Sequence, residues 1–376
     1  MGSSITMTGV TGDPTLARLI LDSTTTHNRL DKLTDQASTG LIADTYAGLG
    51  TGAPISLDLR PQVAGLQTWQ NNVDAATGRM SAAQSALTEL QSIAADFYAQ
   101  LNNVQSVNAS EVDTIAASAR DALRQVAGLL DTQDGGVYVF AGQDTGNPPV
   151  PDPDSILTSG FYAQINAAVG NLAINGSAVT ATTTYNVAVS NTAGTSPFSA
   201  WLSQPSATLR ANPPVVQVGQ NQTEPVGIPA SANGLIPDLP TVGSTIPGGP
   251  PASTGSYMRD LLRALATIGS LSSSQANDPG FDDLMQDTRV SLSQAVGAMA
   301  QDAGALGNVQ SSLTATQTRL ADTETALTGQ VSNAEDVDMA ATLSKLSLVQ
   351  TQMQASYQLI ATLGGMSLVK FLPIGS

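Results

Sequence analysis

Residues 66–104 read LQTWQNNVDAATGRMSAAQSALTELQSIAADFYAQLNNV, and this stretch decides the fold. Apolar residues recur along it in steps of three and four, with no proline between them. They are Leu66, Trp69, Val73, Ala76, Met80, Ala83, Leu87, Leu90, Ala94, Phe97, Leu101 and Val104. A 3.5-residue period held for this length predicts a helix that packs along other helices. At 1.5 Å per residue the helix would be about 58 Å long, and so long a stripe needs a partner helix to cover it.

A second stretch with the same period covers residues 281–327, towards the other end of the chain, and is the expected partner. Shorter helices are predicted at 14–37, ending at Gly40, and at 110–129. The last helix is predicted to open at 332–335, where Ser-Asn-Ala-Glu has the form of a capping box. Because the two long helices come from opposite ends of the sequence, the helical domain is expected to be discontinuous.

The middle of the chain has a different composition. Most of the 20 prolines fall between residues 147 and 251, among short strand-like runs at 173–174, 185–189 and 215–218. The sequence therefore predicts a mainly α fold: a discontinuous long-helix bundle formed by the N- and C-terminal regions, with an inserted β-rich domain. The expected parts are a terminal helical part (1–40 with 332–376), a long-helix bundle (41–142 with 257–331) and a β- and loop-rich insertion (143–256).

Composition excludes several classes of function. The chain has 14 Lys and Arg against 30 Asp and Glu, a formal net charge of −16, which argues against binding to nucleic acid or to anionic lipid. It has no cysteine, so disulfides and thiolate metal or redox chemistry are impossible. No apolar run is long enough to span a membrane, and residues 1–13 lack the features of a cleaved signal.

Candidate catalytic or ligand-binding residues are few, and each has a simpler explanation. His27 is the single histidine, so no catalytic triad or multi-histidine metal site can form around it. The glycines of segment 48–52 follow no predicted strand, so a backbone crossover is favoured over a phosphate-binding loop. The acidic residues of segment 278–287 sit at a helix start without the spacing of a calcium loop. We therefore expect no catalytic, cofactor or metal site.

The first and last helices carry apolar stripes with few charges, and these stripes are the candidate assembly surface. Two interpretations remain open: the two helices pair within one chain, or they are loosely held alone and become buried between subunits. The predicted interface residues are Leu16, Leu19, Leu30, Leu33, Met339, Leu343, Leu346, Met353, Ile360, Leu363, Leu368, Phe371 and Leu372.

Four segments resemble the flagellin and hook-associated protein family of bacterial flagella. They are LDKLTDQASTG at 30–40, QNNVDAA at 70–76, AEDVDMA at 334–340 and MSLVKFL at 366–372. The resemblance covers roughly residues 10–145 and 257–372. It implies terminal α-helical layers, a β-rich outer domain, secretion through the flagellar type III apparatus and assembly by packing of the terminal helices. The chain departs from the family at 46–54, where a glycine-rich loop replaces the usual SDDxA.

Within this family, GGVYVFAGQDT at 135–145, followed by two prolines at 148–149, is similar to the GxYLFSGxxTxxPP segment of hook–filament junction proteins. This resemblance implies a structural, non-enzymatic subunit of the extracellular flagellum. The implied partners are copies of itself, the hook-side junction protein, flagellin and an export chaperone. Alternatives are a filament flagellin and, from another class, a secreted surface module that binds glycans or mediates adhesion.

Overall fold

The computed structural model describes residues 14–103, 109–232 and 243–369, with only the backbone at 14–17, 19, 103, 109 and 363–369. The predicted mainly α fold is confirmed. The α-helices are α1 (Pro14–Thr39), α2 (Ala53–Asn103), α3 (Ala109–Leu130), α4 (Gly160–Gly170), α5 (Leu172–Val189), α6 (Ser206–Ala211), α7 (Tyr257–Gly269), α8 (Phe281–Glu335) and α9 (Met339–Val369). Two antiparallel hairpins pair β1 (Gln133–Asp134) with β2 (Val137–Tyr138) and β3 (Val215–Gly219) with β4 (Gln222–Pro225).

The chain forms two compact units. Unit 1 comprises the described residues up to Leu66 and from Asp322 onward, and unit 2 comprises those from Gln67 to Ala321. The helices α2 and α8 each contribute one end to unit 1 and the other to unit 2.

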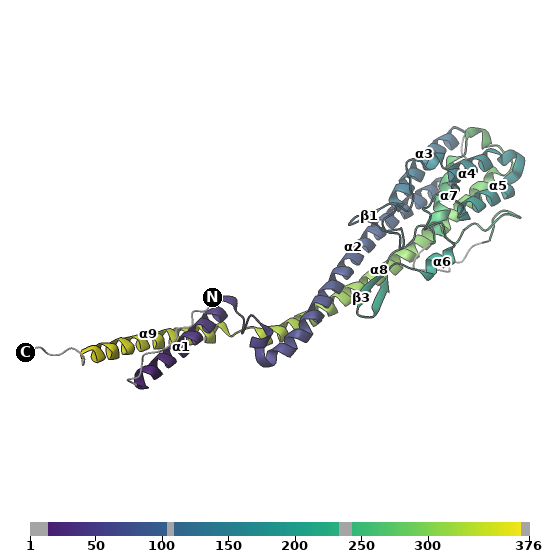
Figure 1. The fold of residues 1–376 in the computed structure, drawn as a ribbon. Coiled ribbons are helices and arrows are strands. Elements are labelled where there is room, and N and C mark those ends of the chain that lie inside the picture. The colour runs from purple at the N-terminus through teal and green to yellow at the C-terminus, as the bar shows by residue number, and fades with distance from the viewer. Residues whose placement is uncertain (1–13, 104–108, 233–242, 370–376) are drawn as a thin grey trace, which may run out of the picture. The chain divides into compact units, whose positions relative to one another are not determined.

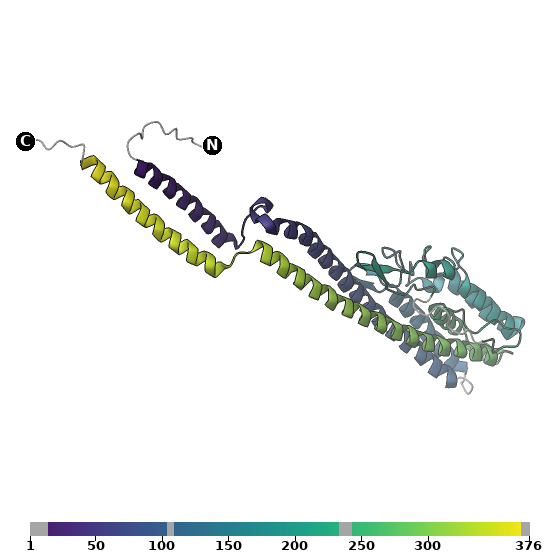
Figure 2. The same ribbon diagram turned by 90° about the horizontal axis from the view of Figure 1, so that it is seen from below.

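In unit 2 the two long helices lie side by side (Figures 1 and 2). Arg289 donates to Asn102 at 2.6 Å and Gln310 to Ser81 at 3.5 Å, so α8 runs antiparallel to α2. The predicted pairing of the two rods is thereby confirmed. From Val73 to Leu101 every residue of the predicted stripe is buried, because a strict 3.5-residue repeat keeps one face against the partner.

The start of α2 differs from the prediction, which treated residues 46–54 as a glycine-rich loop. A 3₁₀ helix, η1 (Tyr46–Gly52), leads directly into α2 at Ala53, and Pro61 lies inside the helix. A proline at such a position removes one backbone hydrogen bond, at a cost of about 3 kcal/mol. The first turns of α2 carry Ser56 and Arg60, whose contacts with Glu335 offset part of this cost.

The inserted region is more helical than the sequence indicates. The strands predicted at 173–174 and 185–189 are wrong, since both segments lie in α5. Thr182 and Thr183 donate their hydroxyls to carbonyls one turn back, at 2.7 and 2.8 Å, which lets threonines sit in a helix. Packing of α5 against α7 then overrides the β propensity of the threonine and valine side chains. The predicted strand at 215–218 is confirmed as β3.

Helix α7 is the centre of unit 2, and all 13 of its residues are buried (Figure 1). Its arginines bind both the inserted region and α8. Arg259 donates to the carbonyl of Ala188 at 2.6 Å, and Arg263 pairs with the fully buried Asp287 at 3.0 Å. Burial lowers the pKa of Arg259 to about 10 and raises that of Asp260. These arginines tie the insertion to the helical bundle through one shared core.

Candidate assembly surface

In unit 1, helices α1 and α9 lie side by side (Figures 1 and 2). On each helix the buried and half-buried residues recur in steps of three and four and form a line that faces the other helix. The line on α1 has Ser23, Thr26, Leu30, Leu33 and Ala37, and the line on α9 has Thr342, Leu346, Val349, Met353, Ser356 and Ile360. Of the α1 line only Leu33 is fully buried, and the other four are half-buried. The pair therefore encloses a thin, partly polar seam rather than a full core.

The predicted interface residues divide into three groups. Leu30, Leu33, Leu346, Met353 and Ile360 lie on the seam between α1 and α9.

A second group lies off the seam. Met339 and Leu343 are 40% and 51% exposed, so the predicted stripe on α9 is partly out of register with the observed one. The side chains of the third group are not described by the structure. Only the backbone is described for Leu16, Leu19, Leu363 and Leu368, and Phe371 and Leu372 lie outside the described residues.

The sequence prediction missed a further apolar face of α9. Leu348 and Leu359 are 59% and 55% exposed, and a spacing of 11 residues places them on one side of the helix, away from the seam. Lys345 is the single charged residue in this 31-residue helix. A helix with apolar residues on all sides is normally buried on all sides, whereas α1 covers one side. The near absence of charge was the signal in the sequence that indicated this face.

The chain crosses between the paired helices and the long helices at two adjacent points of unit 1. The Ile42 amide donates to the carbonyl of Glu335 at 2.6 Å, and the Val337 amide donates to that of Gly40 at 2.9 Å. Gly40 has a φ of +75°, the left-handed conformation that ends α1. We call these paired segments, 40–42 and 335–337, the crossover. It links the segment that follows α1 to the segment that precedes α9 through backbone hydrogen bonds.

Glu335 anchors the crossover by its side chain. Its carboxylate, 8% exposed, accepts hydrogen bonds from Ser56 Oγ and from Arg60 Nε, the latter at 2.7 Å. The hydrogen bond from Arg60 is the main reason that the pKa of Glu335 is lowered to about 2. The hydrogen bond from Ser56 lowers the pKa further, whereas burial of the carboxylate acts in the opposite direction. The predicted capping box at 332–335 is therefore wrong. Instead, Asp338 caps α9 by accepting from the amide of Ala341 at 3.0 Å.

A cavity of about 200 Å³ lies beside the crossover and is lined by Arg60, Glu335 and residues of the segment 41–49. The glycines of η1 have steric roles here. A Cβ on Gly48 would lie 2.4 Å from that of Ala43, and one on Gly52 would lie 2.7 Å from the carbonyl oxygen of Ala334. These close approaches agree with the backbone crossover expected for segment 48–52.

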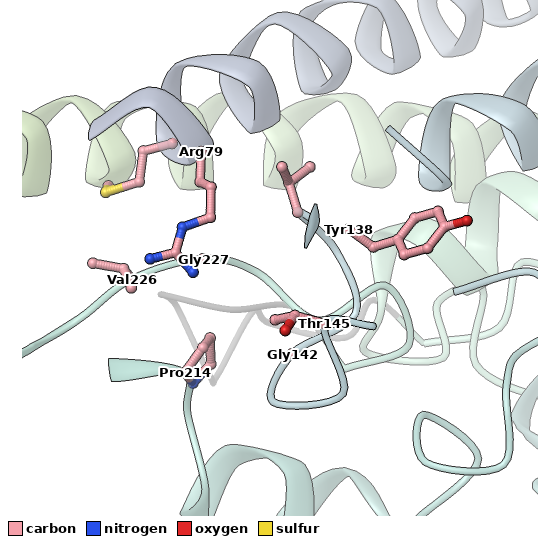
Figure 3. Close-up of a pocket in the computed structure, with 9 residues that line it drawn as sticks. Arg79, Tyr138, Gly142, Thr145, Pro214, Val226 and Gly227 are labelled. Atoms are coloured by element: carbon pink, nitrogen blue, oxygen red, sulfur yellow. The ribbon is translucent and has the colours of Figure 1, made fainter. Parts of the chain in front are cut away.

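Unit 2 contains a much smaller cavity, of about 30 Å³ (Figure 3). Arg79 of α2 extends towards Gly227 and Pro214, and Thr145 lies on the opposite wall. The volume is sufficient for about one water molecule, so this cavity cannot hold an organic substrate.

The other candidate residues take ordinary structural roles. His27 Nε2 lies 2.8 Å from the hydroxyl of Tyr357, which ties α1 to α9. In the acidic segment, Asp287 pairs with Arg263, and Asp283 accepts from Ser177 at 3.2 Å. Over the residues described, no cluster of His, Asp or Glu is arranged to hold a metal ion, and no helix is long and apolar enough to cross a bilayer.

The fold and its surfaces define a class of protein in which long helices from both ends of the chain pair, and the terminal helices keep apolar faces uncovered. Comparison with known families agrees. The model of the bacterial flagellin N-terminal helical region matches residues 18–145, and that of the flagellin C-terminal helical region matches 291–372. Together they cover more than half of the chain, which therefore belongs to the bacterial flagellin family.

Members of this family are exported structural subunits that assemble with copies of themselves into the flagellum, and are not enzymes. Among curated proteins, none matches the chain significantly.

Proposed function

We propose that this flagellar subunit forms the junction between hook and filament. The observation that carries the proposal is the segment 135–149, which resembles the corresponding segment of junction proteins. Its Phe140 is fully buried, and the Phe140 carbonyl accepts from the amide of Ala230 at 2.9 Å. Gly142, with a φ of +68°, leaves room for the ring of Trp201, which would lie 2.3 Å from an added Cβ. The segment thus serves to seat the inserted region on the helical bundle.

Assembly would use the terminal helices. In this proposal residues 1–40 and 332–376 form an inner layer, residues 41–142 and 257–331 form the bundle around it, and residues 143–256 face outward. The partners would be copies of the chain, the hook-side junction protein and flagellin, with a chaperone during export and a final extracellular location. The exposed faces of α9, at Leu348 and Leu359, support a need for further helices around this one.

A filament flagellin is the second candidate, because both matched regions are those of flagellin. Immunogold labelling of isolated flagella distinguishes the two. Label in one band between hook and filament supports the junction, whereas label along the filament contradicts it. Growth of the purified protein into micrometre-long filaments, seen by negative-stain electron microscopy, would also contradict the junction proposal.

The assembly surface is tested separately with Leu348→Asp and Leu359→Asp. Both side chains are more than half exposed, so each variant should keep the helix content and unfolding midpoint of the wild type yet fail to incorporate into flagella. Ile174→Asp is the matched control, since Ile174 is 83% exposed in unit 2. Normal incorporation of both α9 variants would refute the assembly role of this face.

A further inference from the structure

Helix α1 carries a net positive charge along one side. Arg18, Arg29 and Lys32 are spaced by 11 and 3 residues, which places them on one face of an α-helix. All three are exposed, and none forms an ion pair with a carboxylate in the part of the chain that the structure describes. We call these three residues the basic stripe. The exposed Asp22 lies on the same face, between Arg18 and Arg29 in the sequence, so this face carries three positive charges and one negative charge.

The crossover region of the same unit has the opposite charge. Five exposed acidic side chains lie on the segments that lead into and out of it: Asp35, Asp44, Asp58, Asp336 and Asp338. The one basic residue within 35–66 and 322–338 is Arg60, and Glu335 already neutralises it. Asp44 also lines the cavity beside the crossover. We call these five residues the acidic patch.

We propose that the basic stripe of one copy binds the acidic patch of a second copy. This inference rests on the proposed function in that the partner is another copy of the chain. The two surfaces differ, so the contact is heterologous, and heterologous contacts produce rings or open helical arrays rather than closed two-fold dimers. Charge complementarity would then set the direction and stagger of neighbouring copies.

The geometry of α1 limits the stagger. At 1.5 Å per residue, Lys32 lies about 12 Å and Arg18 about 33 Å along the helix from Gly40. A copy displaced by about 12–33 Å along the α1 axis therefore brings its crossover level with the stripe of its neighbour. A nucleic acid or an anionic membrane is a poorer partner, because a chain with a net charge of −16 is repelled by both.

Cross-linking between copies tests the contact directly, because the chain has no cysteine of its own. Lys32→Cys and Asp44→Cys are placed in separate chains, mixed, assembled and oxidised. Disulfide-linked heterodimers are expected in the assembled fraction and not in dilute monomer. Lys32→Cys mixed with Arg210→Cys, an exposed site in unit 2, is the matched control. Cross-linking no stronger than in this control would overturn the proposal.

Charge reversal tests whether the contact matters for assembly. Lys32→Glu or Asp44→Lys alone should raise the critical concentration for assembly by about three- to tenfold at low salt. The double variant, with both charges reversed, should recover most of this loss, whereas Arg210→Glu should assemble like the wild type. Circular dichroism and unfolding midpoints confirm that each variant folds.

The outcomes separate this inference from the proposed function. Assembly of the wild type with no effect of Lys32→Glu, or with no recovery in the double variant, overturns the charge contact and leaves the structural function standing. Absence of any association between wild-type copies, with or without hook fragments, overturns both.

Discussion

Replacing Glu335 by Gln should loosen the crossover without unfolding the protein. Glutamine has nearly the same size and can still accept a hydrogen bond from Ser56, but it lacks the charge that Arg60 binds. The amides of Ile42 and Val337 report on this change, because each is bonded to a carbonyl across the crossover.

The expected size follows from the lowered pKa of Glu335. A shift from 4.5 to about 2 corresponds to about 3 kcal/mol at most. Arg60 is 56% exposed, so solvent screening reduces the contribution to about 1–2 kcal/mol. At pH 7 hydrogen exchange at Ile42 and Val337 should therefore be about 5- to 30-fold faster in Glu335→Gln than in the wild type.

The pH dependence has a definite sign. Since the folded state holds Glu335 at a lower pKa than the unfolded state, the stabilisation is complete above about pH 4.5 and declines as the pH falls towards 2. The difference between wild type and Glu335→Gln in protection, corrected for intrinsic exchange rates, should shrink over this interval.

Asp58→Asn is the matched control, because Asp58 is an exposed acid on the same turns of α2. It should leave the exchange of both amides within about twofold of the wild type. Equal protection of Ile42 and Val337 in Glu335→Gln and wild type at pH 7 would refute the role of the Glu335 side chain.

Two further predictions concern unit 2, whose unfolding can be followed by fluorescence because both tryptophans, Trp69 and Trp201, lie in it. Burial raises the pKa of Asp131 to about 6, so the wild type loses stability as the pH rises from 3.8 to 6. Asp131→Asn should therefore stabilise unit 2 by about 1–2 kcal/mol at pH 8 but not at pH 3.5. An equal gain at both pH values would contradict burial of the charge as the cause. Arg263→Met should destabilise unit 2 by about 3–5 kcal/mol because it leaves Asp287 buried and unpaired, and adding Asp287→Leu should restore most of the loss, whereas no recovery would show that the arginine acts through its other contacts.

The long helices could be predicted from the sequence because their signal is local and repeated. Every turn of α2 from Val73 to Leu101 places an apolar residue on the same face, so errors at single positions do not matter. The fold of the insertion could not be predicted in the same way. The segment that forms α5 has the composition of a strand, and its helical state depends on packing against α7, which is more than 60 residues away in the sequence.

The candidate site shows the same division between local and distant signals. The seam residues Leu30 and Leu33 follow from periodicity alone, and the structure places them between α1 and α9. Glu335 was predicted to cap the last helix because its local sequence has the form of a capping box. Its actual partners, Ser56 and Arg60, are 279 and 275 residues away, and no local pattern indicates such a contact.

The crossover also explains how a thin seam between α1 and α9 can serve an assembling protein. A seam that includes Ser23 and Thr26 buries little apolar area, and α9 keeps Leu348 and Leu359 exposed. The free energy that holds these two helices together in a single chain is therefore small. The backbone bonds at Gly40 and Ile42 and the carboxylate of Glu335 fix the base of the pair independently of the seam. In the proposed assembly, the outer faces of these helices would contact neighbouring subunits, while the crossover would keep α1 and α9 side by side.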